Sequence, residues 1–225
     1  YHSIVDDSVC EIIKDEPQWR IVDCVEPALS HEGYQQELIK KNNKSKRLRN
    51  AMEFWLNEHP GDPYACAKLG ALDVSEGALE RGLILLRKGL SKLEESQCNA
   101  NERYELLLNL GIALTPNDID AAVDAYKEAL CLPIGERVRL GALINLAALL
   151  MKRGELDEAI SLTTQATEQA PEVALAWYNL GLMRRRRGDL EEALFAYSRA
   201  IALNPNHAET HQNFALANLL SGNIS

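Results

Sequence analysis

Four asparagines recur at nearly equal intervals along the sequence. They are Asn109, Asn145, Asn179 and Asn213, separated by 36, 34 and 34 residues, in the contexts L-N-L-G, I-N-L-A, Y-N-L-G and Q-N-F-A. A primary amide carries both hydrogen-bond donors and an acceptor. A row of such amides could bind the N–H and C=O groups of an extended peptide without reading its side chains. Lys68 takes the place of asparagine in an earlier segment of the chain.

Basic residues gather at two further places. Lys152 and Arg153 come directly before a glycine, and so do the four arginines at 184–187. Ammonium and guanidinium groups can bind the carboxylates of an acidic or C-terminal peptide. The alternative is that these cations complement the dipole at the end of a helix and pair with nearby acids such as Asp189.

The segments that carry these residues repeat with a period of about 34 residues. Residues 174–207 show large and small side chains at fixed offsets: Trp177, Leu180, Gly181, Gly188, Ala193, Tyr197, Ala200 and Pro205. This pattern resembles the tetratricopeptide repeat, with Arg184 at a position usually held by tyrosine. Similar offsets predict units at residues 63–96, 104–133, 140–173 and 174–207, followed by a half-repeat at 208–225.

The resemblance implies an all-α fold, an α-α superhelix in which each unit is a helical hairpin and the hairpins stack into a solenoid over residues 63–225. Glycine or alanine at the eighth position of a unit would let paired helices approach closely, and a glycine would end each first helix in a left-handed cap. The resemblance also implies that the first helices line a concave face. The peptide-binding residues predicted there are Lys68, Asn109, Asn145, Asn179, Asn213, Lys152, Arg185 and Arg186. The alternative for the asparagines is that this residue is simply common at that position of the family.

The first 62 residues differ in kind from the repeats. Residues 1–5 and 19–25 are rich in β-branched side chains, which predicts short strands around a brief helix in a small α/β element at 1–44. A linking helix is expected at 45–62. The segment S-H-E-G-Y at 30–34, the basic run that follows it and P-G-D-P-Y at 60–64 resemble the junction between the catalytic domain and the repeats of bacterial family-two glycosyltransferases.

Composition limits the classes of partner. The 225 residues carry a formal charge of −9, which argues against a general affinity for nucleic acid. No apolar run reaches the roughly 20 residues that a membrane span requires. Five widely spaced cysteines predict neither a disulfide framework nor a zinc site. Because free cysteines are typical of a reducing compartment, we expect a cytoplasmic protein. His207 and His211 have no third metal ligand nearby in the sequence, so we expect no metal and no cofactor.

Two functions are consistent with the sequence. The first is a non-enzymatic module that binds an extended peptide or a partner protein on the concave face. The second is the C-terminal region of a family-two glycosyltransferase, whose repeats position the acceptor; the chain itself contains no complete active site. The last helix has no second helix to cover Phe214 and Leu219, so it either caps the stack or self-associates with another copy.

Overall fold

The computed structural model describes residues 44–94 and 99–222, and these residues are helical with short connections. The predicted α/β element at 1–44 lies, except for its last residue, outside the described residues. Within them the chain forms helices in the following order: α3 (Lys44–Glu58), α4 (Pro63–Ser75), α5 (Leu79–Glu94), α6 (Ala100–Leu114), α7 (Ile119–Cys131), the short 3₁₀ helix η2 (Glu136–Arg139), α8 (Leu140–Arg153), α9 (Leu156–Gln169), α10 (Ala174–Arg187), α11 (Leu190–Leu203) and α12 (Ala208–Leu220).

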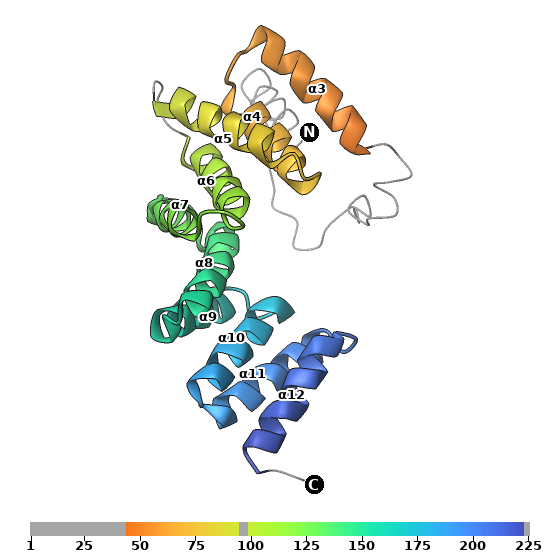
Figure 1. Cartoon of the computed structure of the whole chain (residues 1–225), viewed down its shortest axis with the longest axis vertical. Coiled ribbons are helices and arrows are strands. Elements are labelled where there is room, and N and C mark those ends of the chain that lie inside the picture. The colour runs from red at the N-terminus through yellow and green to blue at the C-terminus, as the bar shows by residue number, and fades with distance from the viewer. Residues whose placement is uncertain (1–43, 95–98, 223–225) are drawn as a thin grey trace, which may run out of the picture. The chain divides into compact units, whose positions relative to one another are not determined.

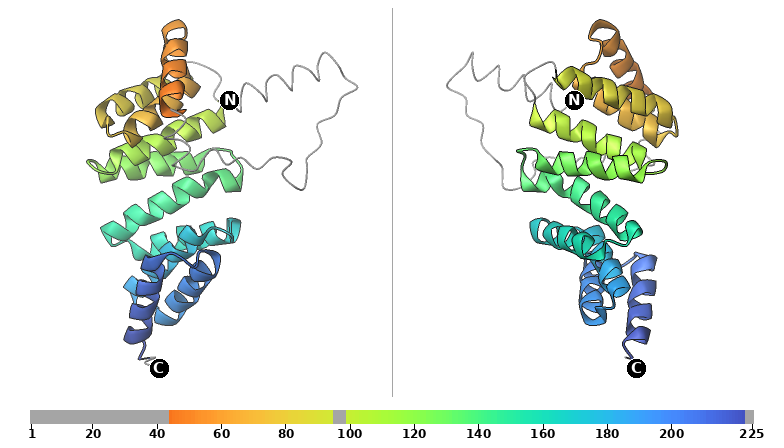
Figure 2. Two further views of the ribbon diagram at one scale, coloured as in Figure 1. Left: turned by 90° about the vertical axis from the view of Figure 1, so that its right-hand side faces the viewer. Right: turned by 60° about the vertical axis from the view of Figure 1, so that its left-hand side comes forward.

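From α4 onward the helices form antiparallel hairpins that stack in chain order (Figures 1 and 2). The pairs are α4 with α5, α6 with α7, α8 with α9 and α10 with α11. The second helix of each pair also packs on the first helix of the next pair, and α11 packs on α12 in the same way. The predicted all-α solenoid is therefore confirmed for the part of the chain that the structure describes.

Capping residues fix where several helices begin and end. The Asp62 carboxylate accepts a hydrogen bond from the backbone N–H of Ala65 over 2.8 Å, and Pro63 occupies the first turn of α4. Asn99 caps α6, which therefore begins before residue 104, where the sequence pattern placed the start of that unit. At the other end of α8 and α10, Gly154 and Gly188 adopt φ values of 84° and 96°. These are the left-handed caps that the glycine pattern predicted.

In the hairpins α6–α7 and α10–α11, a glycine on the first helix accommodates a large side chain of the second. A Cβ atom added to Gly181 would lie 2.6 Å from the Tyr197 ring, and one added to Gly111 would lie 2.5 Å from the Tyr126 ring. Both tyrosines are buried. The glycines are therefore required by close packing, which confirms the alternation of small and large residues inferred from the repeat.

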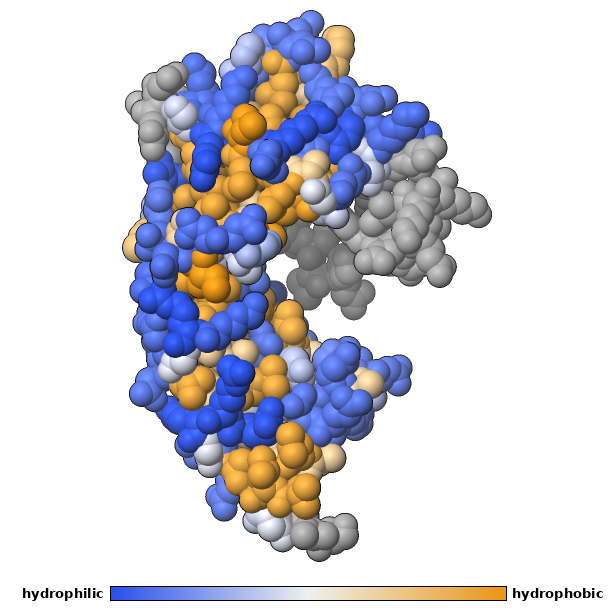
Figure 3. Space-filling model, viewed as in Figure 1, coloured by the Kyte–Doolittle hydropathy of each residue, from blue (hydrophilic) through white to orange (hydrophobic). Residues whose placement is uncertain are grey.

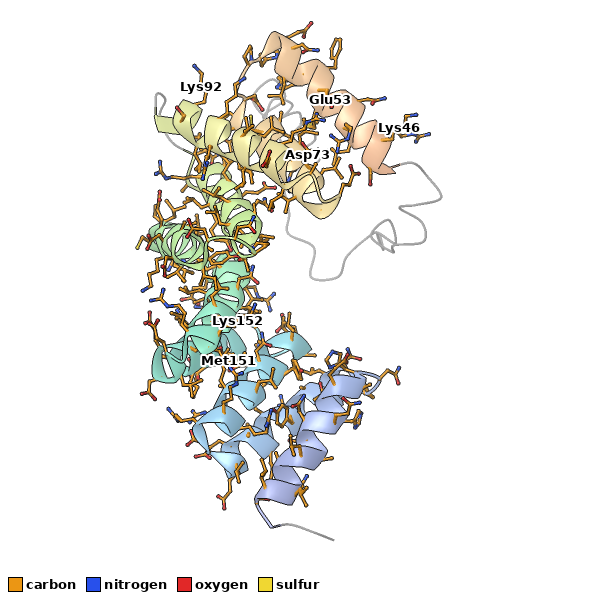
Figure 4. All side chains as sticks on the ribbon, viewed as in Figure 1. Lys46, Glu53, Asp73, Lys92, Met151 and Lys152 are labelled. Atoms are coloured by element: carbon orange, nitrogen blue, oxygen red, sulfur yellow. The ribbon has the colours of Figure 1, made fainter. Side chains whose placement is uncertain are left out.

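Helix α3 is attached to the repeats largely through charged side chains. The buried Asp73 carboxylate of α4 pairs with Arg49 of α3 over 2.6 Å and with Arg81 of α5 over 3.0 Å. Glu53 of α3 lies on the side of the helix that faces Asp73 and pairs with Arg81 over 2.5 Å (Figure 4). The charged network thus joins three helices at the start of the described region.

None of the helices in residues 44–94 and 99–222 combines the length and apolar character that a membrane span requires.

Candidate functional site

The first helices of successive hairpins contact one another directly along the stack: α4 with α6, α6 with α8, α8 with α10, and α10 with α12. We call the surface of these five helices the first-helix face. All eight residues predicted to bind peptide lie on these helices. The repeat pattern thus places them on neighbouring elements, although they span almost 150 residues of sequence, from Lys68 to Asn213.

Three of the four asparagines are engaged within the protein. The Nδ2 atoms of Asn109 and Asn213 donate to the backbone carbonyls of Glu105 and Glu209, one turn earlier in the same helix, over 2.9 and 2.8 Å. The amide of Asn145 interacts with the hydroxyl of Tyr126: burial raises the pKa of that phenol, and hydrogen bonds with Thr115 and Asn145 oppose the rise. These amides are held in fixed orientations by the fold.

Asn179 differs from the other three. Its side chain is half-buried, and it makes no hydrogen bond to another residue of the described chain. A primary amide can form several hydrogen bonds. The donors and the acceptor of the Asn179 amide are therefore not used within the described chain.

Lys68 is already paired on the first-helix face. Its ammonium group lies 2.5 Å from the carboxylate of Glu105 on α6 and 5.2 Å from the centre of the Tyr64 ring. The charge at this end of the face is thus neutralised inside the protein. Any ligand would have to compete with Glu105 for this lysine.

The four arginines at the end of α10 divide into two pairs. Arg184 pairs with Asp189 over 3.1 Å, and Arg187 pairs with both Asp189 and Asp157, the latter over 2.8 Å. The guanidinium groups of Arg187 and Arg184 hold the pKa of the Asp189 carboxyl below its usual range. For these two arginines the alternative interpretation, pairing with nearby acids, is confirmed.

Arg185 and Arg186 are instead directed to neutral acceptors. Arg185 Nη2 donates to the Oδ1 atom of Asn213 on α12 over 3.2 Å, and Arg186 Nη1 donates to the backbone carbonyl of Met151 on α8 over 3.1 Å. Lys152, beside Met151 at the end of α8, is exposed (Figure 4). In the described residues none of Lys152, Arg185 and Arg186 pairs with a carboxylate. We call these three residues the basic patch.

A recess at the opposite end of α10 from Arg185 and Arg186 was not predicted. It has a volume of about 220 Å³ and lies between the start of α10, the end of α11 and the start of α12. Its lining includes Leu175, Tyr178, His207 and Thr210. The positions of two lining residues within the repeat are the one feature of the sequence that could have indicated the recess. Leu175 and Tyr178 occupy the second and fifth positions of their unit, which face inward in the tetratricopeptide family.

The described histidines and acids form no cluster of three or more side chains that could hold a metal ion. His207 Nδ1 instead lies 2.6 Å from the hydroxyl of Thr210, and His211 Nε2 lies 2.8 Å from the carbonyl oxygen of Pro205. Both rings are thus used to shape the start of α12.

The last helix leaves apolar side chains exposed. Leu216, Leu219 and Leu220 of α12 are 41%, 59% and 55% exposed, and Figure 3 shows an apolar patch over the C-terminal end of this helix. Phe214, by contrast, packs against Ala193, Tyr197 and Ala217. Self-association through α12 stays a prediction, now restricted to the three leucines.

Models of the tetratricopeptide repeat family match residues 142–174 and 174–207. A TPR repeat-containing protein of Synechococcus elongatus is 41% identical over 214 residues, which cover 95% of this chain and 52% of the relative. The chain thus spans about half the length of that protein. The presence of tetratricopeptide repeats is confirmed.

Solved structures show the same fold. YrrB, described as a TPR protein with an unusual peptide-binding site, has a TM-score of 0.57 and 22% identity, covering 84% of this chain and 88% of its own. MamA has a TM-score of 0.60 and 20% identity, covering 80% and 99%. The Cut9 and Hcn1 assembly of the APC/C has a TM-score of 0.69 and 16% identity, covering 80% and 34%. None of these comparisons supports the resemblance of residues 1–70 to a glycosyltransferase junction.

Proposed function

Because the chain contains tetratricopeptide repeats stacked into a solenoid, we propose that it is a protein-interaction scaffold whose first-helix face binds an extended, acidic segment of a partner protein. The observation that carries this proposal is the division among the basic residues of α8 and α10. Arg184 and Arg187 are paired with Asp189, whereas the basic patch has no carboxylate partner in the described chain. The patch therefore offers positive charge to a ligand.

The net charge of the protein makes this patch selective. A chain with a formal charge of −9 repels acidic partners on average. A carboxylate-bearing segment is attracted where several unneutralised positive charges lie on neighbouring helices of one face. Arginine adds geometric specificity, because its planar group can donate two parallel hydrogen bonds to one carboxylate.

The asparagines supply the second part of the proposed site. Asn179 lies on α10 with the two arginines of the patch, and Asn145 lies on α8 with Lys152. Their amides are suited to the backbone of an extended peptide, and the patch is suited to its acidic groups. The description of YrrB as a peptide-binding TPR protein supports the assignment of peptide binding to this fold.

The sequence also allowed a glycosyltransferase whose repeats position the acceptor. That hypothesis depends on residues 1–70, of which the first 43 lie outside the described chain. No feature of the first-helix face favours it over a scaffold. The proposal is therefore restricted to binding.

An array of randomised decapeptides tests the proposed function. We expect the wild-type protein to retain peptides enriched in Asp and Glu, and the triple variant Lys152→Gln, Arg185→Gln, Arg186→Gln to lose that enrichment. A matched triple variant, Arg87→Gln, Lys127→Gln, Arg199→Gln, removes the same charge from the second helices α5, α7 and α11. This control should retain the enrichment in acidic peptides. Equal loss in both variants, or no acidic enrichment in the wild type, would contradict the proposal.

A further inference from the structure

We propose that the recess between α10, α11 and α12 is an anchor site for one large apolar side chain, either aromatic or aliphatic, of the same peptide whose carboxylate Arg185 binds. This inference rests on the proposed function and adds a specificity to it. The peptide would carry its apolar residue about three positions from an acidic group.

The polar groups of the recess are largely satisfied by one another. His207 Nδ1 and the Thr210 hydroxyl lie 2.6 Å apart, and the phenol oxygen of Tyr178 accepts a hydrogen bond from Asn213 over 3.4 Å. The rings of Tyr178 and His207 meet edge to face with centroids 5.1 Å apart. Apart from the Asn204 side chain, carbon atoms are therefore left to form most of the walls.

Two alanines, Ala174 and Ala200, complete the lining together with Leu175 and Asn204. Leu175 is 53% exposed, so this leucine presents apolar surface to solvent at the mouth of the recess. Burial of that surface by a ligand would be favourable by about 25 cal/mol for each Å² removed from water. An apolar side chain is thus the ligand group that this recess favours.

The volume of the recess selects the size of that group. At about 220 Å³ it is smaller than the sites of about 300–1,000 Å³ that enclose whole small molecules. It is larger than the apolar cavity of about 150 Å³ that is known to hold a benzene molecule. The recess therefore fits a single side chain of the size of leucine, methionine or phenylalanine.

One amide connects the recess to the basic patch. Asn213 donates to the Tyr178 hydroxyl and accepts a hydrogen bond from Arg185. Tyr178 and Arg185 are seven residues apart on α10, or about 10 Å along the helix axis. An extended peptide covers that distance in about three residues. The acidic group is either the side chain of Asp or Glu or the C-terminal carboxylate, since both present the same oxygens.

Peptides of defined spacing test this inference. One set places phenylalanine one to five residues from a single glutamate, a second set replaces phenylalanine with alanine, and a third moves the acid to a free C-terminus. We expect the wild-type protein to bind the phenylalanine peptides with a spacing of two or three residues at least about tenfold more tightly than the alanine peptides. The first and third sets together distinguish a side-chain acid from a terminal one.

Two variants alter the recess itself. Ala174→Leu fills the recess, and we expect this variant to lose the preference for phenylalanine. It should still bind peptides that carry the acid in preference to the same peptides with the carboxylate converted to an amide. Leu175→Ala removes an exposed wall, and it should weaken the preference even if Ala174→Leu fails to fold. Ala51→Leu, at an exposed position of α3, is the matched control and should change nothing.

The outcomes separate this inference from the proposed function. If acidic peptides are preferred but phenylalanine gives no advantage at any spacing, the anchor site is wrong and the scaffold proposal stands. The anchor site is also wrong if Ala174→Leu and Leu175→Ala both keep the full preference. If no peptide in any set depends on its acid, the proposed function fails and the anchor site fails with it.

Discussion

Arg185 of α10 donates a hydrogen bond to the side-chain oxygen of Asn213 on α12, 28 residues further along the chain, over 3.2 Å. The Nδ2 atom of Asn213 is fixed by the carbonyl of Glu209, which orients the amide oxygen toward the arginine. A guanidinium group has five N–H donors; this contact uses one of them, and the Nε–H of Arg185 is buried in the described chain. The arginine is thus held across the first-helix face with its charge unneutralised and donors remaining for a ligand.

Loss of Asn213 should therefore weaken the binding of an acidic peptide. Asn213→Ala frees the guanidinium of Arg185, and ordering it again on binding costs affinity. A hydrogen bond to a charged group contributes about 1.5 kcal/mol or more, which corresponds to about a tenfold rise in Kd. Fluorescence anisotropy with a labelled acidic peptide from the array measures this change.

Asn218→Ala is the matched control for that variant. Asn218 lies on the same helix and donates to the carbonyl of Phe214 one turn earlier, but it does not contact Arg185. Its Kd should equal that of the wild type, with the helix content of both variants unchanged in circular dichroism. An equal loss in the two variants would show that the helix, and not the orientation of Arg185, determines affinity.

The amides of Asn145 and Asn179 should separate binding from stability. Replacing either residue with alanine removes an amide from the proposed backbone-binding row and should weaken peptide binding. Asn179→Ala should leave the free energy of unfolding within about 0.5 kcal/mol of the wild type. Asn145→Ala should lower it by about 1 kcal/mol, because Asn145 interacts with the buried Tyr126 hydroxyl. Urea denaturation and peptide titration measure the two effects, and unchanged affinity in both variants would rule out the row of amides.

The packing of the hairpins predicts a large effect from one methyl group. Gly181→Ala places a Cβ atom 2.6 Å from the Tyr197 ring, so either the ring or the helix must move. Overpacking of this kind costs about 1–3 kcal/mol of unfolding free energy. Gly135→Ala is the control, because its Cβ would meet no atom closer than 4.0 Å. A variant at 181 as stable as the variant at 135 would contradict the close packing of α10 and α11.

The buried Cys66 thiol predicts a loss of stability at high pH. Burial raises the pKa of this thiol to about 11, from an ordinary value of 9.0. Between these values the unfolded chain has released the proton while the folded chain keeps it. The folded state then binds more protons, so the free energy of unfolding falls as the pH rises from about 9 to about 11.

Urea denaturation across that range should show a shallower fall in Cys66→Ala. Tyr104, Tyr126, Tyr178 and Tyr197, whose pKa values burial also raises, remain in the variant and contribute to the residual slope. Identical slopes in the two proteins would show that Cys66 does not take up its proton as described. Native alkylation gives a second measure, since Cys131 is exposed and should react far faster than Cys66.

The sequence predicted the periodic features of the fold and missed those that depend on contacts between distant units. The glycines at 154 and 188 recur with the repeat, and their left-handed caps follow from local backbone geometry. The division of the four arginines has a local component, because Arg184 and Arg187 are three residues apart and share one helix face, toward Asp189. The repeat offsets had already placed Arg185 and Arg186, and not this pair, among the predicted peptide-binding residues.

The partners of Arg185 and Arg186 could not be predicted, because Asn213 and Met151 lie 28 and 35 residues away. Their contacts depend on how three first helices pack side by side. The recess has the same origin: it forms where the ends of three helices from two units meet. Such features are set by tertiary packing, which a repeat pattern places only approximately.

The salt dependence of binding tests the central claim, which is that the unpaired charge of Lys152, Arg185 and Arg186 holds an acidic partner. The probe is a fluorescein-labelled decapeptide with two glutamates and a phenylalanine three residues from one of them. Its Kd should rise steeply as NaCl screens the charges in the wild type and in the matched triple variant on α5, α7 and α11. The triple variant Lys152→Gln, Arg185→Gln, Arg186→Gln should bind at least about tenfold more weakly, with little dependence on salt. Equal affinity and equal salt dependence in all three proteins would contradict the account.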